Sequence, residues 1–211
     1  VGPHQARRTQ DLRSQYDGEI AYTDAQFGRL IEQLKQSDAY DNTLIIVVSD
    51  HGEQFLEHND GGHGKSLHEE ELRVPLLIKL PQQQHGGEVR DALVEMLDIA
   101  PTILDYLELP IPGTFRGRSF RDLIETGSTA PRIGFSELLL EDKDCIATRT
   151  PEEKYIKDFV QQTEVWYDLA EDPGEWFAKT SPVRDPDLLR PTAHARNLEG
   201  KPGLHMLIPP I

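Results

Sequence analysis

The chain has 211 residues, of which 37% are hydrophobic and 16 are glycine, a composition typical of a globular protein with a buried core. Its formal net charge is -15 at pH 7 and no stretch is basic, which argues against a nucleic-acid or anionic-membrane partner. A single cysteine, Cys145, excludes an internal disulfide framework, and no apolar run is long enough to predict a membrane span. Because the chain begins at Val1 without an initiator methionine or a leader, we expect it to be a piece of a longer protein.

The first half of the chain alternates between helix-type and strand-type patterns. Apolar residues recur at steps of three and four between residues 11 and 36, which predicts one long amphipathic helix. The apolar, mostly β-branched run at residues 44–48 predicts a buried strand, and residues 74–80 predict a second buried strand. Residues 67–72 indicate a short helix between them. Helix followed by strand twice over favours an α/β fold with a parallel sheet.

Beyond the second strand, residues 99–109 predict a helix with Asp98 as its N-cap. The later segments are shorter and are separated by tight polar turns, which is typical of a small antiparallel sheet. Its four expected strands are residues 133–137, 145–149, 155–159 and 164–168. The predicted organisation is therefore an α/β part at residues 1–125, a small antiparallel subdomain at residues 126–180, and an irregular or disordered tail at residues 181–211.

Asp50-His51-Gly52 directly follows the first predicted strand, at the edge where open α/β sheets place their ligands. An aspartate beside a histidine offers one oxygen and one nitrogen ligand, which suits calcium, manganese, magnesium or zinc depending on the remaining ligands. In the alternative interpretation, Asp50 caps the following turn and His51 lies on the surface. The following residues favour a site, because they include further histidines, a lysine and flexible glycines: His58, His63, Lys65, His68, Gly61, Gly62 and Gly64.

Several blocks of sequence, in order, resemble the second-half signature of the sulfatases of the alkaline phosphatase superfamily. The central blocks are Ser49-Asp50-His51-Gly52-Glu53, Glu57-His58, Gly62-His63-Gly64 and residues 67–76. Further agreement comes from residues 16–30, Asp98-Ile99-Ala100-Pro101-Thr102, Gly117-Arg118-Ser119, Tyr167-Asp168-Leu169 and Asp172-Pro173-Gly174-Glu175. The resemblance implies part of an alkaline-phosphatase-like sheet flanked by helices, followed by a small four-stranded antiparallel subdomain.

The resemblance also assigns metal ligands. Asp50 and His51 match the two ligands that this half of the fold contributes to one divalent cation, usually calcium, with manganese and magnesium as alternatives. The cation would act as a Lewis acid on the oxygens of the transferred group.

Three further residues receive roles from the resemblance. His58 matches a histidine of the same loop, and His63 falls where many sulfatases carry a lysine that contacts the sulfate ester, so both are expected to be catalytic and His63 also to bind substrate. A histidine can contact an oxyanion or protonate a leaving oxygen. Lys65 either supplies the positive charge of the missing lysine or faces solvent. His68 replaces a tyrosine and is expected to pack, and residues 69–71 are expected to form a solvated acidic helix face.

The nucleophile of the family is not present in this chain. In sulfatases it is a formylglycine made from a cysteine or serine within a Cys/Ser-x-Pro/Ala-x-Arg motif, and this motif belongs to the first half of the fold. Cys145 lies outside any such motif and is interpreted as a structural residue. We expect the formylglycine and the remaining metal ligands in the N-terminal half of the parent protein.

The function predicted from these residues is metal-dependent hydrolysis of a sulfuric ester, with a small-molecule or carbohydrate sulfate ester as substrate. This chain alone is expected to be inactive, because it lacks the nucleophile and half of the metal ligands. A phosphodiester or phosphonate ester hydrolase, or a phosphotransferase, of the same superfamily is the first alternative. A non-catalytic binding module is the second, although retention of four ligand-type residues in one loop weighs against it.

Overall fold

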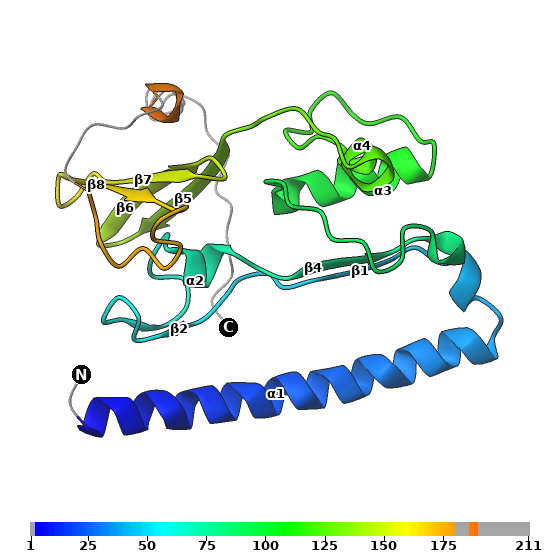
Figure 1. Cartoon of the computed structure of the whole chain (residues 1–211), viewed down its shortest axis with the longest axis horizontal. Coiled ribbons are helices and arrows are strands. Elements are labelled where there is room, and N and C mark those ends of the chain that lie inside the picture. Colours follow the sequence, from blue (N-terminus) through cyan, green and yellow to red (C-terminus); the bar gives the residue numbers. More distant parts are fainter. Residues whose placement is uncertain (1–2, 180–185, 190–211) are drawn as a thin grey trace. The chain divides into compact units, whose positions relative to one another are not determined.

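The computed structural model describes residues 3–179 and 186–189, which belong to two compact units that divide between Ala130 and Pro131. The first unit contains one long helix, two short strand pairs and several short helices, and the second contains a four-stranded sheet (Figure 1). Among the described residues, no helix is both long enough and apolar enough to cross a membrane.

Helix α1, Pro3–Gln36, is one continuous helix that begins several residues before the predicted start (Figure 1). Its apolar stripe is only half covered: Phe27 is half-buried, whereas Ile20 is exposed. Side-chain contacts tie the helix to the segment after β1: Arg13 forms an ion pair of 2.7 Å with Glu57, and the Tyr16 ring meets the Phe55 ring edge-on at 5.3 Å. The predicted amphipathic helix is therefore present, with much of its apolar face open to solvent.

Strands β1, Ile45–Val48, and β4, Leu76–Lys79, form a two-stranded antiparallel pair, so the expected parallel pairing is wrong. A parallel connection needs a crossover element that carries the chain back along the whole strand. The only helix between the two strands, α2, covers Glu69–Leu72, about one turn, which is too short to do so. The chain instead reverses within the intervening loop and returns beside β1 from the opposite direction.

The β1–β4 pair is also less buried than its sequence predicts. Val47 and Leu77 face each other across the pair and are 36% and 60% exposed, and Leu76 is half-buried. No third strand among the described residues pairs with either β1 or β4. Two strands have too little area to bury both of their faces, and the apolar side chains therefore remain partly open. Among residues 45–48 and 76–80, the buried residue is Leu80, directly after β4, at 2% exposure.

Asp98 does not cap α3 with its side chain, contrary to the prediction. The carboxylate is fully buried and accepts the backbone amides of Glu95, at 2.8 Å, and of Arg118, at 2.9 Å. It thus joins the segment before α3 to the segment before α4. Burial raises the pKa of Asp98, and the amide of Arg118 opposes this shift.

Besides α1 and α2, the helical segments described in the first unit are η1 (Tyr40–Asn42), η2 (Pro81–Gln83), η3 (Met96–Asp98), α3 (Ile99–Tyr106) and α4 (Arg121–Thr126).

The second unit contains the predicted small antiparallel sheet. Its strands are β5 (Gly134–Leu140), β6 (Lys143–Arg149), β7 (Glu153–Asp158) and β8 (Thr163–Asp168), hydrogen-bonded in sequence order. Each strand extends beyond its predicted limits at one end, where further residues, such as Lys143, continue the pairing register. A one-turn 3-10 helix, η4 (Pro186–Leu189), packs on this sheet: Leu188 is fully buried and its carbonyl accepts a hydrogen bond of 2.7 Å from Thr148 Oγ1. The rest of the predicted tail lies outside the described residues.

A buried ion pair joins the sheet to the loop that follows it. Lys154 of β7 and Glu175 are both fully buried, and their charged atoms, Nζ and Oε1, lie 2.7 Å apart. The attraction between the two charges offsets the free-energy cost of removing both from water. The Asp172–Glu175 block of the sequence therefore has a structural role, because its last residue neutralises a lysine inside the sheet.

We predict that Glu175→Gln destabilises the chain by about 3–5 kcal/mol, because it leaves the Lys154 ammonium buried without a counter-charge. Chemical denaturation monitored by tryptophan fluorescence measures the change. The matched control is Glu164→Gln, which removes the partner of Lys157 from an exposed pair and should cost less than about 1 kcal/mol. Equal losses in the two variants would show that the Lys154–Glu175 pair is not the stabilising element proposed.

Candidate metal and substrate site

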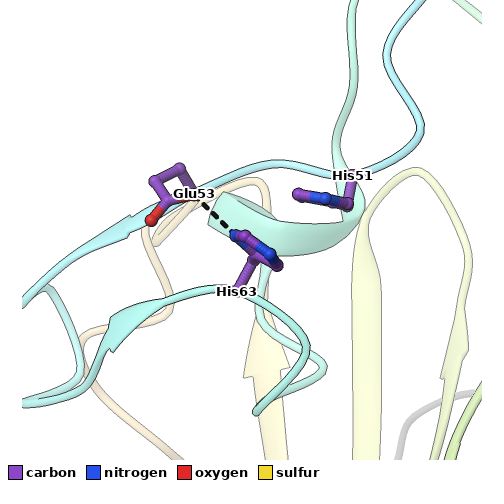
Figure 2. A group of neighbouring side chains, drawn as sticks. All are labelled: His51, Glu53 and His63. Atoms are coloured by element: carbon purple, nitrogen blue, oxygen red, sulfur yellow. Dashed lines mark hydrogen bonds and ion pairs between the residues drawn. The ribbon is translucent and has the colours of Figure 1, made fainter. Parts of the chain in front are cut away.

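Three side chains converge just after β1: His51, Glu53 and His63 (Figure 2). One ligand atom from each can be chosen so that all three lie within 4.8 Å of one another. The rings of His51 and His63 stack with their centroids 4.0 Å apart, and His63 Nδ1 lies 2.9 Å from Glu53 Oε2. The structure therefore brings the predicted ligand His51 and the predicted substrate-contacting residue His63 together, and adds a carboxylate beside His63.

Asp50 lies at the edge of this group. Its side chain is 76% exposed, and Oδ1 is 3.8 Å from His51 Nε2. Two atoms on one cation lie at a similar separation when each is about 2.0–2.6 Å from the metal. Oδ1 also accepts the backbone amide of His51 at 3.0 Å. The geometry thus permits a shared cation on Asp50 and His51, and that assignment stays a prediction.

Glu71 of α2 fastens both segments that carry the cluster. Its backbone carbonyl accepts the amide of Gly52 at 2.8 Å, and Gly52 lies between His51 and Glu53. Its buried carboxylate accepts three consecutive backbone amides after His63, at 2.5 Å from Gly64, 3.1 Å from Lys65 and 2.9 Å from Ser66. One residue therefore fixes the loop of His63 against the segment of His51 and Glu53.

Close backbone contact explains the glycine in Asp50-His51-Gly52. A Cβ at Gly52 would lie 1.9 Å from the carbonyl oxygen of Glu70, so any side chain there would push the segment away from α2. Gly62 and Gly64, with φ of 90° and 69°, adopt the left-handed conformation that glycine tolerates. These glycines let the loop fold back on α2 while His63 projects from it.

His58 belongs to a second group beside the cluster. Its Nδ1 is 2.5 Å from Glu70 Oε1, and its ring stacks on His68 at 3.7 Å. Gln54 donates to the same carboxylate oxygen at 3.0 Å. Burial raises the pKa of Glu70, but the hydrogen bonds from His58 and Gln54 outweigh it, and the net shift is downward. The catalytic role of His58 stays a prediction.

Lys65 is engaged within the loop. Its Nζ donates to the carbonyl of Gly61 at 2.8 Å and lies 3.6 Å from Asp60 Oδ1, and its side chain is 48% exposed. A Cβ added to Gly62 would lie 3.8 Å from Lys65 Nζ and 3.9 Å from Glu53 Oε1. Lys65 and the cluster residue Glu53 therefore both lie next to Gly62. The substrate-binding role of Lys65 remains a prediction.

The sequence did not predict the contacts of three acidic residues of the site: Glu53, Glu70 and Glu71. The acidic run at residues 69–71 is not a solvated face: Glu69 and Glu71 are buried, and Glu70 pairs with His58. A signal for Glu53 does exist, because residues two apart in an extended segment point to the same side, which places it beside His51. Glu71 carries no such signal, since its partners are backbone amides that the loop brings to it.

Cys145 lies on β6 and is buried, in agreement with a structural role. Burial and the neighbouring Asp158 raise the pKa of its thiol to about 11. A thiol with this pKa is a poor nucleophile near neutral pH.

Comparisons with known proteins identify the family of this chain. The family profile described as Sulfatase matches residues 2–109, and the profile described as N-sulphoglucosamine sulphohydrolase, C-terminal, matches residues 62–181. The chain belongs to the sulfatase family. It is 32% identical over 168 residues to an arylsulfatase of Clostridium perfringens, a match that covers 77% of this chain and 34% of that protein. The chain thus spans about a third of the length of this curated relative.

Two solved structures have a similar fold. One is a protein in complex with its substrate D-glucosamine-2-N,6-O-disulfate, with a TM-score of 0.74 and 22% identity over 87% of this chain and 40% of that chain. The other is a phosphonate monoester hydrolase from Silicibacter pomeroyi, with a TM-score of 0.73 and 27% identity over 95% of this chain and 43% of that chain. The predicted α/β fold of the sulfatase type is confirmed, for the part of the relatives that this chain covers.

We predict that Gly52→Ala destabilises the chain by about 1–3 kcal/mol, because the new methyl group must displace the backbone of α2. Thermal unfolding measures the change. Gly18→Ala is the matched control: nothing lies within 4 Å of its Cβ position on α1, so the substitution should be neutral or stabilising. A Gly52→Ala variant as stable as the parent would contradict the close approach.

We also predict that native Cys145 is almost unreactive toward a thiol reagent at about pH 8, because roughly one thiol in a thousand is then ionised and the side chain is buried. The rate of reaction with a chromogenic disulfide, with and without concentrated urea, tests this. Fast and complete labelling of the folded chain would show that the thiol is accessible.

Proposed function

We propose that this chain supplies the C-terminal metal- and substrate-binding part of a sulfuric ester hydrolase. The observation that carries the proposal is the convergence of His51, Glu53 and His63 beside Asp50, in a chain of the sulfatase family. Residues that could bind a cation and residues that could bind an oxyanion occupy one loop system, which is what hydrolysis of an anionic ester requires.

The residues have distinct roles in this proposal. Asp50 and His51 would hold one divalent cation, with calcium as the first candidate and manganese or magnesium as alternatives, together with ligands from the N-terminal half of the parent protein. Bound there, the cation supplies Lewis-acid stabilisation to the oxygens of the sulfuryl group. The formylglycine nucleophile is likewise assigned to that missing half.

His63 is the proposed substrate-contacting and proton-donating group. The ionised Glu53 carboxylate only accepts hydrogen bonds, so His63 Nδ1 carries the proton between them; in the imidazolium form Nε2 also carries a proton, which it can donate to an ester oxygen. This carboxylate fixes the orientation of the ring, as in other catalytic histidines. Lys65 is proposed to add positive charge next to the substrate oxygens. His58, oriented by Glu70, is proposed as the second catalytic histidine.

The proposed substrate is a carbohydrate or other small-molecule sulfate ester. The structural neighbour that was solved with a disulfated glucosamine supports a sulfated sugar. A phosphonate or phosphodiester substrate is the second candidate, because the phosphonate monoester hydrolase covers 95% of this chain at 27% identity. Both ester classes present an anionic group to the same cation and histidine, so only turnover measurements distinguish them.

We predict that His63→Ala in the intact parent protein lowers turnover by about a hundredfold or more with little loss of stability, because it removes the contact with the ester oxygen. The measurement is kcat on matched aryl sulfate, aryl phosphate and phosphonate substrates, with thermal unfolding alongside. The control is Leu80→Ala: this side chain is buried, so truncation should cost about 2–5 kcal/mol while kcat of the folded protein stays near the parental value.

The ester preferred by the parent decides between the two candidate substrates. Near-parental turnover of His63→Ala on all three esters would contradict the assignment of His63. The present chain without the N-terminal half should hydrolyse none of them, and activity in this chain that is lost in Asp50→Ala would contradict the division of the site between two halves.

A further inference from the structure

The donor set of the cluster differs from the one that a calcium site requires. Calcium and magnesium prefer six or more oxygen ligands, whereas two imidazole nitrogens and one carboxylate are a ligand set typical of zinc. His51, Glu53 and His63 supply this set, with their ligand atoms within 4.8 Å of one another. Asp50, the oxygen ligand of the proposed calcium site, is not part of the set.

We infer that Zn2+ binds directly to His51, Glu53 and His63, and that this binding competes with the hard cation and with the substrate. The competition follows from the shared residues: His51 belongs to the proposed calcium site, and His63 to the proposed substrate site. The competition rests on the proposed function, whereas zinc binding itself does not.

A hydrogen bond places the His51 imidazole in the tautomer that a metal needs. His51 Nδ1 lies 2.8 Å from the carbonyl oxygen of Gly52, which can only accept, so this nitrogen carries the proton and Nε2 keeps its lone pair. His63 Nδ1 and Glu53 Oε2 lie 2.9 Å apart, so one Zn2+ can take the place of the proton between them and bind both atoms, with the proton released to solvent. A carbonyl behind a ligating histidine, like that of Gly52 behind His51, is the usual outer contact of zinc sites.

The scaffold brings these donors together before any metal binds. Glu71 holds the His51–Glu53 segment through the amide of Gly52, and the loop of His63 through the amides that follow His63. Less ordering is then needed when a metal binds, which favours affinity. His63 is half exposed, so an ion can reach the cluster from solvent.

The decisive experiment is a zinc titration of this chain against a chromophoric chelator in calcium-free buffer. We expect one equivalent of Zn2+ to bind, and His63→Ala and Glu53→Gln each to weaken binding by about tenfold or more. Asp50→Asn should change the affinity less than about twofold. So should His85→Ala, which removes the histidine of another His–carboxylate pair, with Glu88 at 3.1 Å.

A second measurement does not depend on variants. In two-bond 1H–15N spectra of the unaltered chain, zinc should shift the Nε2 resonance of His51 and the Nδ1 resonance of His63 and leave those of His85 in place. Unchanged His51 and His63 signals, or full zinc affinity in His63→Ala, would overturn the site. Loss of zinc binding in Asp50→Asn to the same extent as in His63→Ala would also overturn it, because zinc would then use the Asp50–His51 pair.

The two proposals fail separately. If the intact parent shows no ester hydrolysis while this chain binds zinc as described, the proposed function is wrong and the zinc site stands. If the parent is active and zinc does not inhibit it in competition with the aryl sulfate, the competition is wrong.

Discussion

The hydrogen bonds of Glu71 are the constraint on which the candidate site depends. The residue lies on a one-turn helix, yet it ties down the segment after β1 with its carbonyl and the glycine-rich loop with its carboxylate. A buried carboxylate is stable only when its oxygens are satisfied, and three backbone amides satisfy this one. The loop is therefore held in one backbone conformation, although it is rich in glycine and contains only short strands. The positions of His51, Glu53 and His63 relative to one another follow from this attachment.

The parts of the fold that could be predicted are those with a strong local pattern. The period of α1, the apolar run of β1 and the turn-separated strands of the second unit each depend on neighbours close in sequence. The direction of the β1–β4 pairing could not be predicted, because it depends on how the loop between them reverses. The burial of β1 was overestimated for a related reason: apolar composition shows that a strand can be buried, and tertiary structure decides whether it is covered.

The candidate site divides in the same way. Asp50, His51 and His63 stand out because their chemistry and their place after a strand coincide, and the resemblance to the sulfatases adds their roles. Glu70 and Glu71 resemble an ordinary charged helix surface in the sequence. Their functions come from partners in the loop, His58 and the amides after His63, which only the folded chain brings near. Acidic runs beside a glycine-rich loop can thus be internal supports of the loop rather than surface charge.

The buried pair of Lys154 and Glu175 determines where the chain can be shortened. The four-stranded sheet ends at Asp168, so a boundary chosen by secondary structure would fall soon after that residue. Such a cut would remove Glu175 and leave a lysine charge inside β7. The smallest independent version of the second unit must therefore include the loop that contains Glu175 and also η4, whose Leu188 is buried on the sheet. The same holds for any chimera that exchanges this sheet between relatives.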